Sequence, residues 1–366
     1  MKIILVVGAR PNFMKVATVY KAFKKNYPLV NVKICHTGQH YDAKMSHIFF
    51  NDLEMPQPDF YLGVGSGSHA VQTANIMIEF EKVCLEEKPD VVLVSGDVNS
   101  TIACGLVAAK LQIKLGHIES GLRSFDRKMP EEINRILTDC ISDYLFVTEK
   151  SGLENLKNEG IPQEKIFFTG NCMIDSLIDF LPKAQNSEIK QKLGINEKYI
   201  LLTFHRPSNV DNREFYNGFQ KLIQRYSNNF KFVFPIHPRT RKNLETFGIN
   251  ISNYPNLILT EPLGYIDFLR LIKDSFCVIT DSGGIQEETT YLGIPCVTIR
   301  ENTERPITVE VGTNYLAGTD FNNVFNIVDD IINNNAKKGK IPFLWDGKAG
   351  ERVAKIIIEK FNNHNN

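Results

Sequence analysis

The chain opens with Met1-Lys2-Ile3-Ile4-Leu5-Val6-Val7-Gly8 and continues with Ala9-Arg10-Pro11-Asn12-Phe13-Met14-Lys15. A short, unbroken apolar run that ends at a glycine is typical of a strand buried on both faces of a parallel sheet. The proline that follows favours the first turn of a helix. This stretch therefore predicts the first strand, turn and helix of an α/β fold.

The same alternation of apolar strands and helical segments continues along most of the chain. A polar stretch at residues 184–198 divides it into two series. The pattern predicts two Rossmann-like, doubly wound domains that face a central cleft. We place them at residues 1–172 and 173–349, with a C-terminal helix at about 350–362 packing back on the first domain. The expected strands are 3–7, 32–37, 91–95, 114–118, 144–147 and 166–169, then 199–203, 231–235, 257–260, 277–280 and 296–299.

The composition excludes several classes of protein. The 42 basic residues cancel the 42 acidic ones, so no overall charge attracts nucleic acid or an anionic membrane. The first apolar run is too short for a signal peptide, and no stretch approaches the roughly 20 apolar residues of a membrane helix. Seven scattered cysteines without a C-x-x-C pair suggest neither a disulfide framework nor a zinc site. We expect a cytoplasmic protein that binds no nucleic acid, membrane or metal.

Two expected strand-to-helix turns have the features of an anion site. Arg10 and Lys15 accompany the glycine turn after the first strand, where free N–H groups and the positive end of a helix dipole attract anions. Ser282, Gly283 and Gly284 open another helix after residues 277–280 in the same way. The alternative for both stretches is a plain turn, with the charged side chains in solvent.

Two further residues accompany the second of these turns. Glu288 lies one helical turn beyond the glycines, where a carboxylate suits the two hydroxyls of a ribose. Arg305 lies in the nearby run of residues 300–306, which adds positive charge beside the glycines. The sequence thus favours a nucleotide diphosphate as the anion.

Three acidic residues follow strand ends or start a helix. Asp97 lies in S-G-D-V-N-S, Glu119 in H-I-E-S-G-L-R, and Glu131 in M-P-E-E-I-N-R, where Arg135 follows four residues later on the same helix face. We expect the three carboxylates to converge on one rim and to raise one another's pKa, so that one holds a proton while another takes one. Helix capping is an equal alternative for Asp97, and for Glu131 alone an exposed first-turn charge is the commoner role.

Two histidines follow strands of the second series. The run Phe204-His205-Arg206-Pro207 directly follows residues 199–203, which places an imidazole and a guanidinium at the opposing rim. His237 repeats the arrangement after residues 231–235. It either lines the cleft or caps the loop.

Together these motifs resemble those of a known family. In order they are G-A-R-P-x-x-x-K, G-D-x-N-S, H-x-E-S-G-L-R, P-E-E-x-N-R, H-R, H-P-R, D-S-G-G-x-Q-E-E and T-E-R-P. Their order and spacing over residues 3–318 are similar to the non-hydrolysing UDP-N-acetylglucosamine 2-epimerases. The resemblance implies a GT-B-like architecture, a homodimer, a UDP-sugar substrate and a reaction without NAD or metal. It implies reversible epimerisation at carbon 2 of UDP-N-acetylglucosamine to UDP-N-acetylmannosamine, through UDP elimination and a 2-acetamidoglucal intermediate, in the supply of cell-surface polysaccharide synthesis.

The resemblance also implies roles for individual residues. Asp97, Glu119 and Glu131 correspond to the catalytic carboxylates, and His205 is expected to act beside them. Phe268 is expected near the uracil and Glu288 at the ribose. Arg135 and His237 are expected in the substrate site, and Gln39 and His40 match a region that contacts a second, activating UDP-sugar in bacterial relatives. The diphosphate is expected on Arg10, Lys15, Ser282, Gly283, Gly284, His205 and Arg305.

The sequence departs from the common family pattern in ways that concern the substrate. G-D-V-N replaces G-D-T-x, and the stretch at 123–127 before P-E-E is shorter than in many UDP-N-acetylglucosamine enzymes. The shorter form also occurs in relatives that act on other UDP-2-acetamido sugars, including UDP-2,3-diacetamido-glucuronate. That substrate is one alternative; a GT-B glycosyltransferase, a hydrolysing epimerase and a UDP-sugar sensor are the others.

Overall fold

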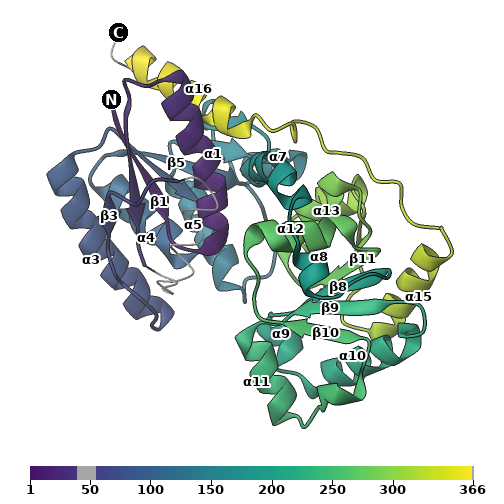
Figure 1. The fold of residues 1–366 in the computed structure, drawn as a ribbon. Coiled ribbons are helices and arrows are strands. Elements are labelled where there is room, and N and C mark those ends of the chain that lie inside the picture. Colours follow the sequence, from purple (N-terminus) through teal and green to yellow (C-terminus); the bar gives the residue numbers. More distant parts are fainter. Residues whose placement is uncertain (39–54, 365–366) are drawn as a thin grey trace. The chain divides into compact units, whose positions relative to one another are not determined.

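The computed structural model describes residues 1–38 and 55–364, which form two compact units (Figure 1). The first unit comprises Met1–Asp179 and Phe343–Asn366, and the second comprises Phe180–Pro342. The chain leaves the first unit within helix α7 (Cys172–Gln185), seven residues after the boundary expected at 172. The first half of α7 belongs to the first unit because its apolar side chains are buried there and Ser176 Oγ donates a hydrogen bond to the backbone oxygen of Met14 (2.6 Å).

The first unit is a doubly wound α/β layer. Its described residues form a seven-stranded parallel sheet in the order β3-β2-β1-β4-β5-β6-β7, so the strand order reverses between β1 and β4. The strands are β1 Lys2–Val7, β2 Asn31–His36, β3 Phe60–Tyr61, β4 Val91–Ser95, β5 Lys114–Ser120, β6 Tyr144–Val147 and β7 Ile166–Phe168. The principal helices are α1 Arg10–Asn26, α3 His69–Glu87, α4 Asn99–Lys110, α5 Pro130–Ile141 and α6 Lys150–Asn158.

The second unit repeats this topology. Its six strands are parallel in the order β10-β9-β8-β11-β12-β13, with the reversal between β8 and β11. The strands are β8 Tyr199–Thr203, β9 Lys231–Pro235, β10 Leu257–Thr260, β11 Cys277–Thr280, β12 Cys296–Thr298 and β13 Asn314–Leu316. The helices are α8 Ile189–Lys192, α9 Pro207–Val210, α10 Arg213–Tyr226, α11 Pro238–Thr246, α12 Tyr265–Asp274, α13 Gly283–Leu292, α14 Pro306–Glu310 and α15 Phe321–Ile332. The predicted fold class, two Rossmann-like domains, is confirmed.

The ends of the inner strands are set by close packing. The apolar run of β1 is buried from Ile3 to Val7, as expected for a central parallel strand. At Gly8 an added Cβ would lie 2.2 Å from Ser100 Oγ, so only glycine lets the end of β1 come this close to the start of α4. This contact brings the turns that follow β1 and β4 together, at the point where α/β sheets bind ligands.

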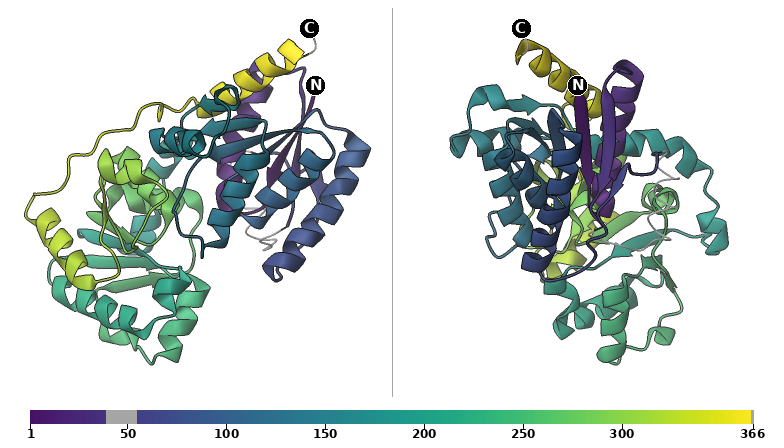
Figure 2. Two further views of the ribbon diagram at one scale, coloured as in Figure 1. Left: turned by 180° about the vertical axis from the view of Figure 1, so that it is seen from behind. Right: turned by 90° about the vertical axis from the view of Figure 1, so that its left-hand side faces the viewer.

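The C-terminal helix α16 (Ala349–His364) completes the first unit. It lies beside α1, where the yellow and purple helices run together in the views (Figure 1, Figure 2). Val353, Ala354 and Ile357 are buried in this contact, and a Cβ at Gly350 would lie 2.8 Å from the backbone oxygen of Thr18. Both ends of the chain therefore build the first unit. No helix among the described residues is long and apolar enough to cross a membrane.

Asp175 holds the start of α16 by a hydrogen bond. Its carboxylate accepts a hydrogen bond from the backbone N–H of Gly350 (2.8 Å). Burial raises the pKa of Asp175 from 3.8 to about 6, although the N–H groups of Gly350 and Ala349 act in the opposite direction. Because the pKa is raised on folding, the carboxyl contributes stability that is complete below its unfolded pKa and is lost as the pH rises through about 6.

We therefore expect Asp175→Asn to remove this pH dependence. Between about pH 4 and pH 7, the free energy of unfolding of the variant minus that of the wild type should rise by roughly 3 kcal/mol. Urea unfolding at several pH values measures the difference. Asp179→Asn is the matched control, because this aspartate of the same helix has a side chain that is 49% exposed. A wild-type-minus-variant difference that does not change with pH would contradict the assignment.

Candidate functional site

The strand ends of the first unit bring two of the predicted carboxylates together. Asp97 follows β4 and Glu119 lies near the end of β5, and these strands pair in parallel with Ser95 opposite Ile118. Gly96 turns the chain between β4 and Asp97 with a φ of +69°. A Cβ at Gly96 would lie 3.4 Å from Lys15 Nζ and 3.5 Å from Glu119 Oε2. The residue before Asp97 thus packs directly on the Glu119 and Lys15 side chains.

Glu119 is buried, ion-paired and conformationally unusual. Its carboxylate pairs with Lys15, and both side chains are less than a tenth exposed. The φ of Glu119 is +73°, at a point where the register between β5 and β6 shifts between Ile118 and Ser120. A positive φ is rare for a residue with a long side chain, and such strain persists mainly where the surroundings fix it, as at active sites. The bulge directs one particular carboxylate into the site.

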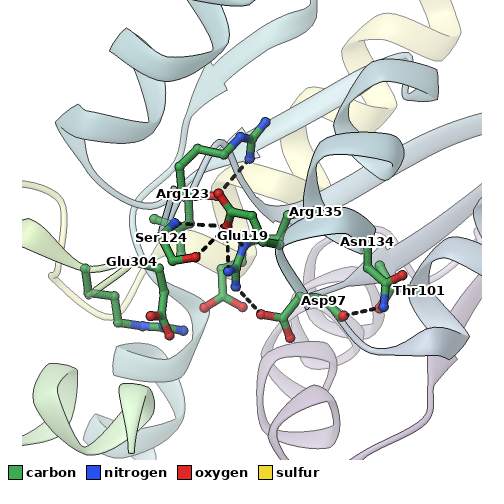
Figure 3. Close-up of polar contacts among 12 residues, drawn as sticks. Asp97, Thr101, Glu119, Arg123, Ser124, Asn134, Arg135 and Glu304 are labelled. Atoms are coloured by element: carbon green, nitrogen blue, oxygen red, sulfur yellow. Dashed lines mark hydrogen bonds and ion pairs between the residues drawn. The ribbon is translucent and has the colours of Figure 1, made fainter. Parts of the chain in front are cut away.

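Asp97 is joined to the same region by Arg135. Figure 3 shows the guanidinium of Arg135 directed at Asp97, with 2.5 Å between Nη1 and Oδ2. Arg135 also bonds Glu132 (2.8 Å from Nη2 to Oε2), which accepts hydrogen bonds from the N–H groups of Ser124 and Phe125. Burial opposes ionisation of Glu132, but these N–H groups and Arg135 lower the pKa of its carboxyl group. Arg135 therefore bridges two acidic residues and fixes the position of Asp97.

Asp97 and Glu131 line a cavity of about 270 Å³ in the first unit. His69 and Gln72 of α3 contribute to its wall, together with Asn134, whose amide donates a hydrogen bond to the backbone oxygen of Asp97 (2.9 Å). Polar walls of this kind suit the hydroxyl and amide groups of a sugar. Neither His69 nor Gln72 was singled out from the sequence, because no motif connects the start of α3 with the ends of β4 and β5.

In the second unit a buried aspartate orients His205. The ends of β8 and β11 pair with Thr203 opposite Thr280, so Asp281 lies beside His205. Asp281 accepts hydrogen bonds from the N–H groups of His205 and Arg206, and its Oδ1 lies 3.1 Å from His205 Nδ1. Burial opposes ionisation of Asp281, but these contacts lower the pKa of its carboxyl group. The contact at Nδ1 fixes the orientation of this half-exposed imidazole.

The glycines of the second unit lie at a helix start beside Arg305. Gly283 and Gly284 are the first residues of α13, and the preceding Ser282 makes no side-chain capping hydrogen bond. Arg305 is buried and held by Glu287 (2.8 Å) and Glu304 (2.6 Å). The N–H groups of the helix start and a fixed guanidinium thus lie together, which suits a phosphate or diphosphate.

The two glycines differ in the space around them, which gives a stability prediction. A Cβ at Gly283 would lie 2.6 Å from Glu304 Oε1 and 2.8 Å from Arg305 Nη1, whereas nothing lies within 4 Å of a Cβ at Gly284. We expect Gly283→Ala to lower the thermal unfolding midpoint, because the buried ion pairs must shift. Gly284→Ala, the matched control, should leave it unchanged or raise it, since alanine favours helix by up to about 1 kcal/mol over glycine. Equal midpoints for the two variants would contradict this packing.

The remaining predicted residues of the second unit are placed as follows. Glu288 is buried and accepts a hydrogen bond from the hydroxyl of Tyr265 (2.9 Å), which the sequence did not indicate. Phe268 lies one turn after Tyr265 on α12 and is partly buried against the core. His237 caps α11, since its Nδ1 accepts the N–H of Arg239 (3.2 Å), and its ring centroid is 6.2 Å from that of His205. Burial, then His205 and Arg239, lowers the pKa of His237.

Some predicted residues cannot be placed. Gln39, His40 and the side chain of Arg10 lie outside the described residues. Across residues 1–38 and 55–364, no cluster of three or more histidine, cysteine, aspartate or glutamate side chains is arranged to hold a metal ion.

Comparison with known proteins places this geometry in a family. The family model described as UDP-N-acetylglucosamine 2-epimerase matches residues 22–358. The chain is 45% identical to the UDP-N-acetylglucosamine 2-epimerase of Methanococcus maripaludis, over 98% of each chain. It is 42% identical to the UDP-2,3-diacetamido-2,3-dideoxy-D-glucuronate 2-epimerase of Pseudomonas aeruginosa, over 98% of this chain and all of that one.

A solved structure agrees over the full length. The crystal structure of the Methanocaldococcus jannaschii UDP-GlcNAc 2-epimerase in complex with UDP-GlcNAc and UDP superimposes with a TM-score of 0.91 at 43% identity, covering 98% of this chain and all of that one. The matched family model and these full-length relatives lead to one conclusion: the chain belongs to the UDP-N-acetylglucosamine 2-epimerase family.

Proposed function

We propose that the chain interconverts UDP-N-acetylglucosamine and UDP-N-acetylmannosamine by inverting carbon 2. One observation carries the proposal. Asp97 and Glu119 occupy the ends of neighbouring strands and each has a cationic partner, in a chain 45% identical over its length to a UDP-N-acetylglucosamine 2-epimerase. This arrangement supports two proton-transfer groups that act on one sugar ring.

The order of bond changes follows from the weak acidity of the proton at carbon 2. Cleavage of the C1–O bond, with UDP leaving, builds positive charge at carbon 1 and makes that proton removable. Loss of the proton gives UDP and 2-acetamidoglucal. Addition of a proton to the opposite face of carbon 2 and of UDP to carbon 1 then gives the epimer. The N–H groups of Gly283 and Gly284, with Arg305, stabilise the negative charge of the departing diphosphate.

The carboxylates transfer the proton at carbon 2. Lys15 beside Glu119 and Arg135 beside Asp97 stabilise ionised, proton-accepting side chains. The group that accepts the proton from one face returns it in the reverse reaction, as microscopic reversibility requires. Glu131, on the wall of the same cavity as Asp97, is a third proton-transfer group.

The binding residues complete the proposal. Arg10, Lys15, Ser282 and His205 contribute to the diphosphate site, while Phe268 stacks near the uracil and Glu288 bonds the ribose. Arg135 and His237 belong to the substrate site. Gln39 and His40 contact a second, activating UDP-sugar.

Hydrogen exchange at carbon 2 tests the function directly. We expect the purified protein, incubated with UDP-N-acetylglucosamine in D2O, to produce UDP-N-acetylmannosamine and to replace hydrogen by deuterium at carbon 2 of both sugars, as followed by NMR. Product without deuterium would exclude the elimination mechanism. Accumulating UDP and free sugar would instead indicate a hydrolysing enzyme.

A second substrate is supported by a specific relative. The Pseudomonas aeruginosa protein, 42% identical to this chain, is named for UDP-2,3-diacetamido-2,3-dideoxy-D-glucuronate. The same exchange experiment with that nucleotide sugar distinguishes the two. A higher kcat/KM for the diacetamido-glucuronate would replace our choice of substrate while leaving the reaction type intact.

We also propose that the chain forms a homodimer through helices α3 and α5 of the first unit. Val71, Ile78 and Leu85 repeat every seven residues on α3 and are each more than half exposed, and Ile133 and Leu137 are exposed on α5. Both helices pack against α4, so these apolar residues belong to one layer of the unit. A stripe of this kind is typical of a protein interface. Light scattering of wild type and Ile78→Asp tests it, and a wild-type monomer would refute it.

The location that we propose is the cytoplasm. All seven cysteines carry free thiols and six of them are buried, a state that a reducing compartment maintains. Fractionation of cells that produce the protein tests this location.

A further inference from the structure

The first unit contains a buried histidine that the proposed mechanism does not use. His117 lies in β5, two residues before Glu119, and is fully buried. Its partner is Asp139 of α5, which is 1% exposed. Burying an ionisable pair lowers stability unless its charges and hydrogen bonds are satisfied. We therefore ask what this pair does beside the proposed proton-transfer groups.

Both ring nitrogens of His117 face hydrogen-bond acceptors. Nδ1 lies 2.6 Å from Asp139 Oδ1, and Nε2 lies 2.7 Å from the backbone oxygen of Gly96. A carbonyl oxygen only accepts, so Nε2 carries a hydrogen. If Asp139 is ionised, Nδ1 carries a hydrogen as well, and the ring is an imidazolium.

The other contacts of Asp139 indicate that it is ionised. Its Oδ2 accepts a hydrogen bond from the backbone N–H of Gly121 (3.0 Å) and pairs with Arg123 Nη1 (2.8 Å). Arg123 in turn pairs with Glu159 (2.6 Å). Burial opposes ionisation of Asp139, but His117 and Arg123 lower the pKa of its carboxyl group.

These hydrogen bonds connect the two segments that carry the carboxylates. Gly96 immediately precedes Asp97, and Gly121 follows Glu119 by two residues. The path runs from the oxygen of Gly96 through the ring of His117 and the carboxylate of Asp139 to the N–H of Gly121. Both glycines have a positive φ, so each segment turns sharply at the point where it is held.

We propose that His117, as an imidazolium held by Asp139, is a positioning residue for the epimerisation. It fixes the separation of the backbone segments that carry Asp97 and Glu119, and thus the placement of the two proton-transfer groups on opposite faces of carbon 2. The inference rests on the proposed function for its catalytic consequence. The protonation of His117 does not depend on that function.

NMR of the histidine rings tests the protonation. With ¹⁵N-labelled histidine and His117→Gln to assign the signals, we expect two slowly exchanging N–H groups on the His117 ring from roughly pH 6 to pH 8. Asp139→Asn should leave a single ring N–H, because the neutral amide no longer stabilises the imidazolium. A single N–H in the wild type would overturn the proposal.

Kinetics test the positioning. We expect Asp139→Asn to lower kcat by about 100-fold, the scale of effect that a misplacement of about 1 Å at the reacting groups produces, with KM for UDP-N-acetylglucosamine and the Kd of UDP nearly unchanged. Asp143→Asn is the matched control. Asp143 accepts the N–H of Leu115 at the opposite end of β5 (3.0 Å), so its loss weakens the same strand without touching the path through His117.

The outcomes are distinguishable. Equal kcat values for Asp139→Asn and Asp143→Asn would overturn the positioning role. If Asp139→Asn does not fold, as judged by circular dichroism, His117→Gln tests kcat instead, since its amide retains one donor for the oxygen of Gly96. If the wild type produces no deuterium exchange at carbon 2, the proposed function fails while the ring N–H signals still report on His117.

Discussion

Glu119→Gln is expected to lower kcat for epimerisation by about a thousandfold, within the range of a positioned general acid or base. Glutamine keeps the size of the side chain and its hydrogen bond to Lys15 but cannot take a proton. UDP should bind at least as tightly as to the wild type, because Lys15 is no longer neutralised by a carboxylate. NMR assays of carbon 2 exchange give kcat, and calorimetry gives the Kd of UDP.

Glu154→Gln is the matched control for this variant. Glu154 lies on the surface of α6 in the same unit, with a side chain 62% exposed, so the same chemical change should leave kcat unaltered. If Glu119→Gln loses UDP binding along with activity, the carboxylate has a structural role and the proton-transfer assignment is wrong.

Lys15→Met is expected to destabilise the protein by about 3–5 kcal/mol, the usual cost of removing one member of a buried ion pair. Glu119 is almost fully buried, so water cannot replace the lost ammonium group. The double variant Lys15→Met/Glu119→Gln should recover most of the loss, since it removes both charges of the buried pair. Urea unfolding of the four proteins of this cycle measures the coupling.

Lys25→Met controls for the loss of a lysine from α1. Its side chain is 74% exposed and lies 3.4 Å from Glu351, and an exposed pair of this kind contributes little. Additive effects of Lys15→Met and Glu119→Gln, with no coupling between them, would show that the pair is solvated in solution.

Much of the fold was predictable because the buried strands of a parallel sheet are continuous apolar runs in the sequence. The strands with four or more buried residues, such as β1 and β4, were located to within a residue or two. Strands β3 and β13 were missed because they are short strands at the edges of their sheets, are only partly buried and lack a continuous buried apolar run. The boundary expected at residue 172 coincides with the start of α7, but the units divide after Asp179 because the first half of this helix packs in the first unit.

The residues of the candidate site were predictable where they follow a strand or lie near the start of a helix. Asp97, Glu119 and His205 follow apolar runs, so their position along the sheet edge could be expected before any pairing was known. Their partners could not, because these depend on strand register and helix packing: Asp281 meets His205 across 76 residues of chain.

The unusual backbone conformation of the site could not be predicted from the sequence either. A glycine in the sequence indicates a possible positive φ, but a glutamate such as Glu119 does not. The conformation of Glu119 is explained by the register shift beside it, which the sequence does not show. Glu119 and Asp97 also have cationic partners, Lys15 and Arg135. From the sequence, only the effect of neighbouring carboxylates on their pKa values was expected.

The return of α16 to the first unit has a practical consequence for dissecting the molecule. A fragment ending at residue 179 would lack the helix that packs on α1, and would expose the part of α1 around Thr18 on which Gly350 lies. The second unit is one uninterrupted segment, Phe180–Pro342, and is therefore the half suited to separate expression. A first-unit fragment is better made by deleting that segment and joining its flanks with a flexible linker, as in a host protein from which a guest domain has been excised.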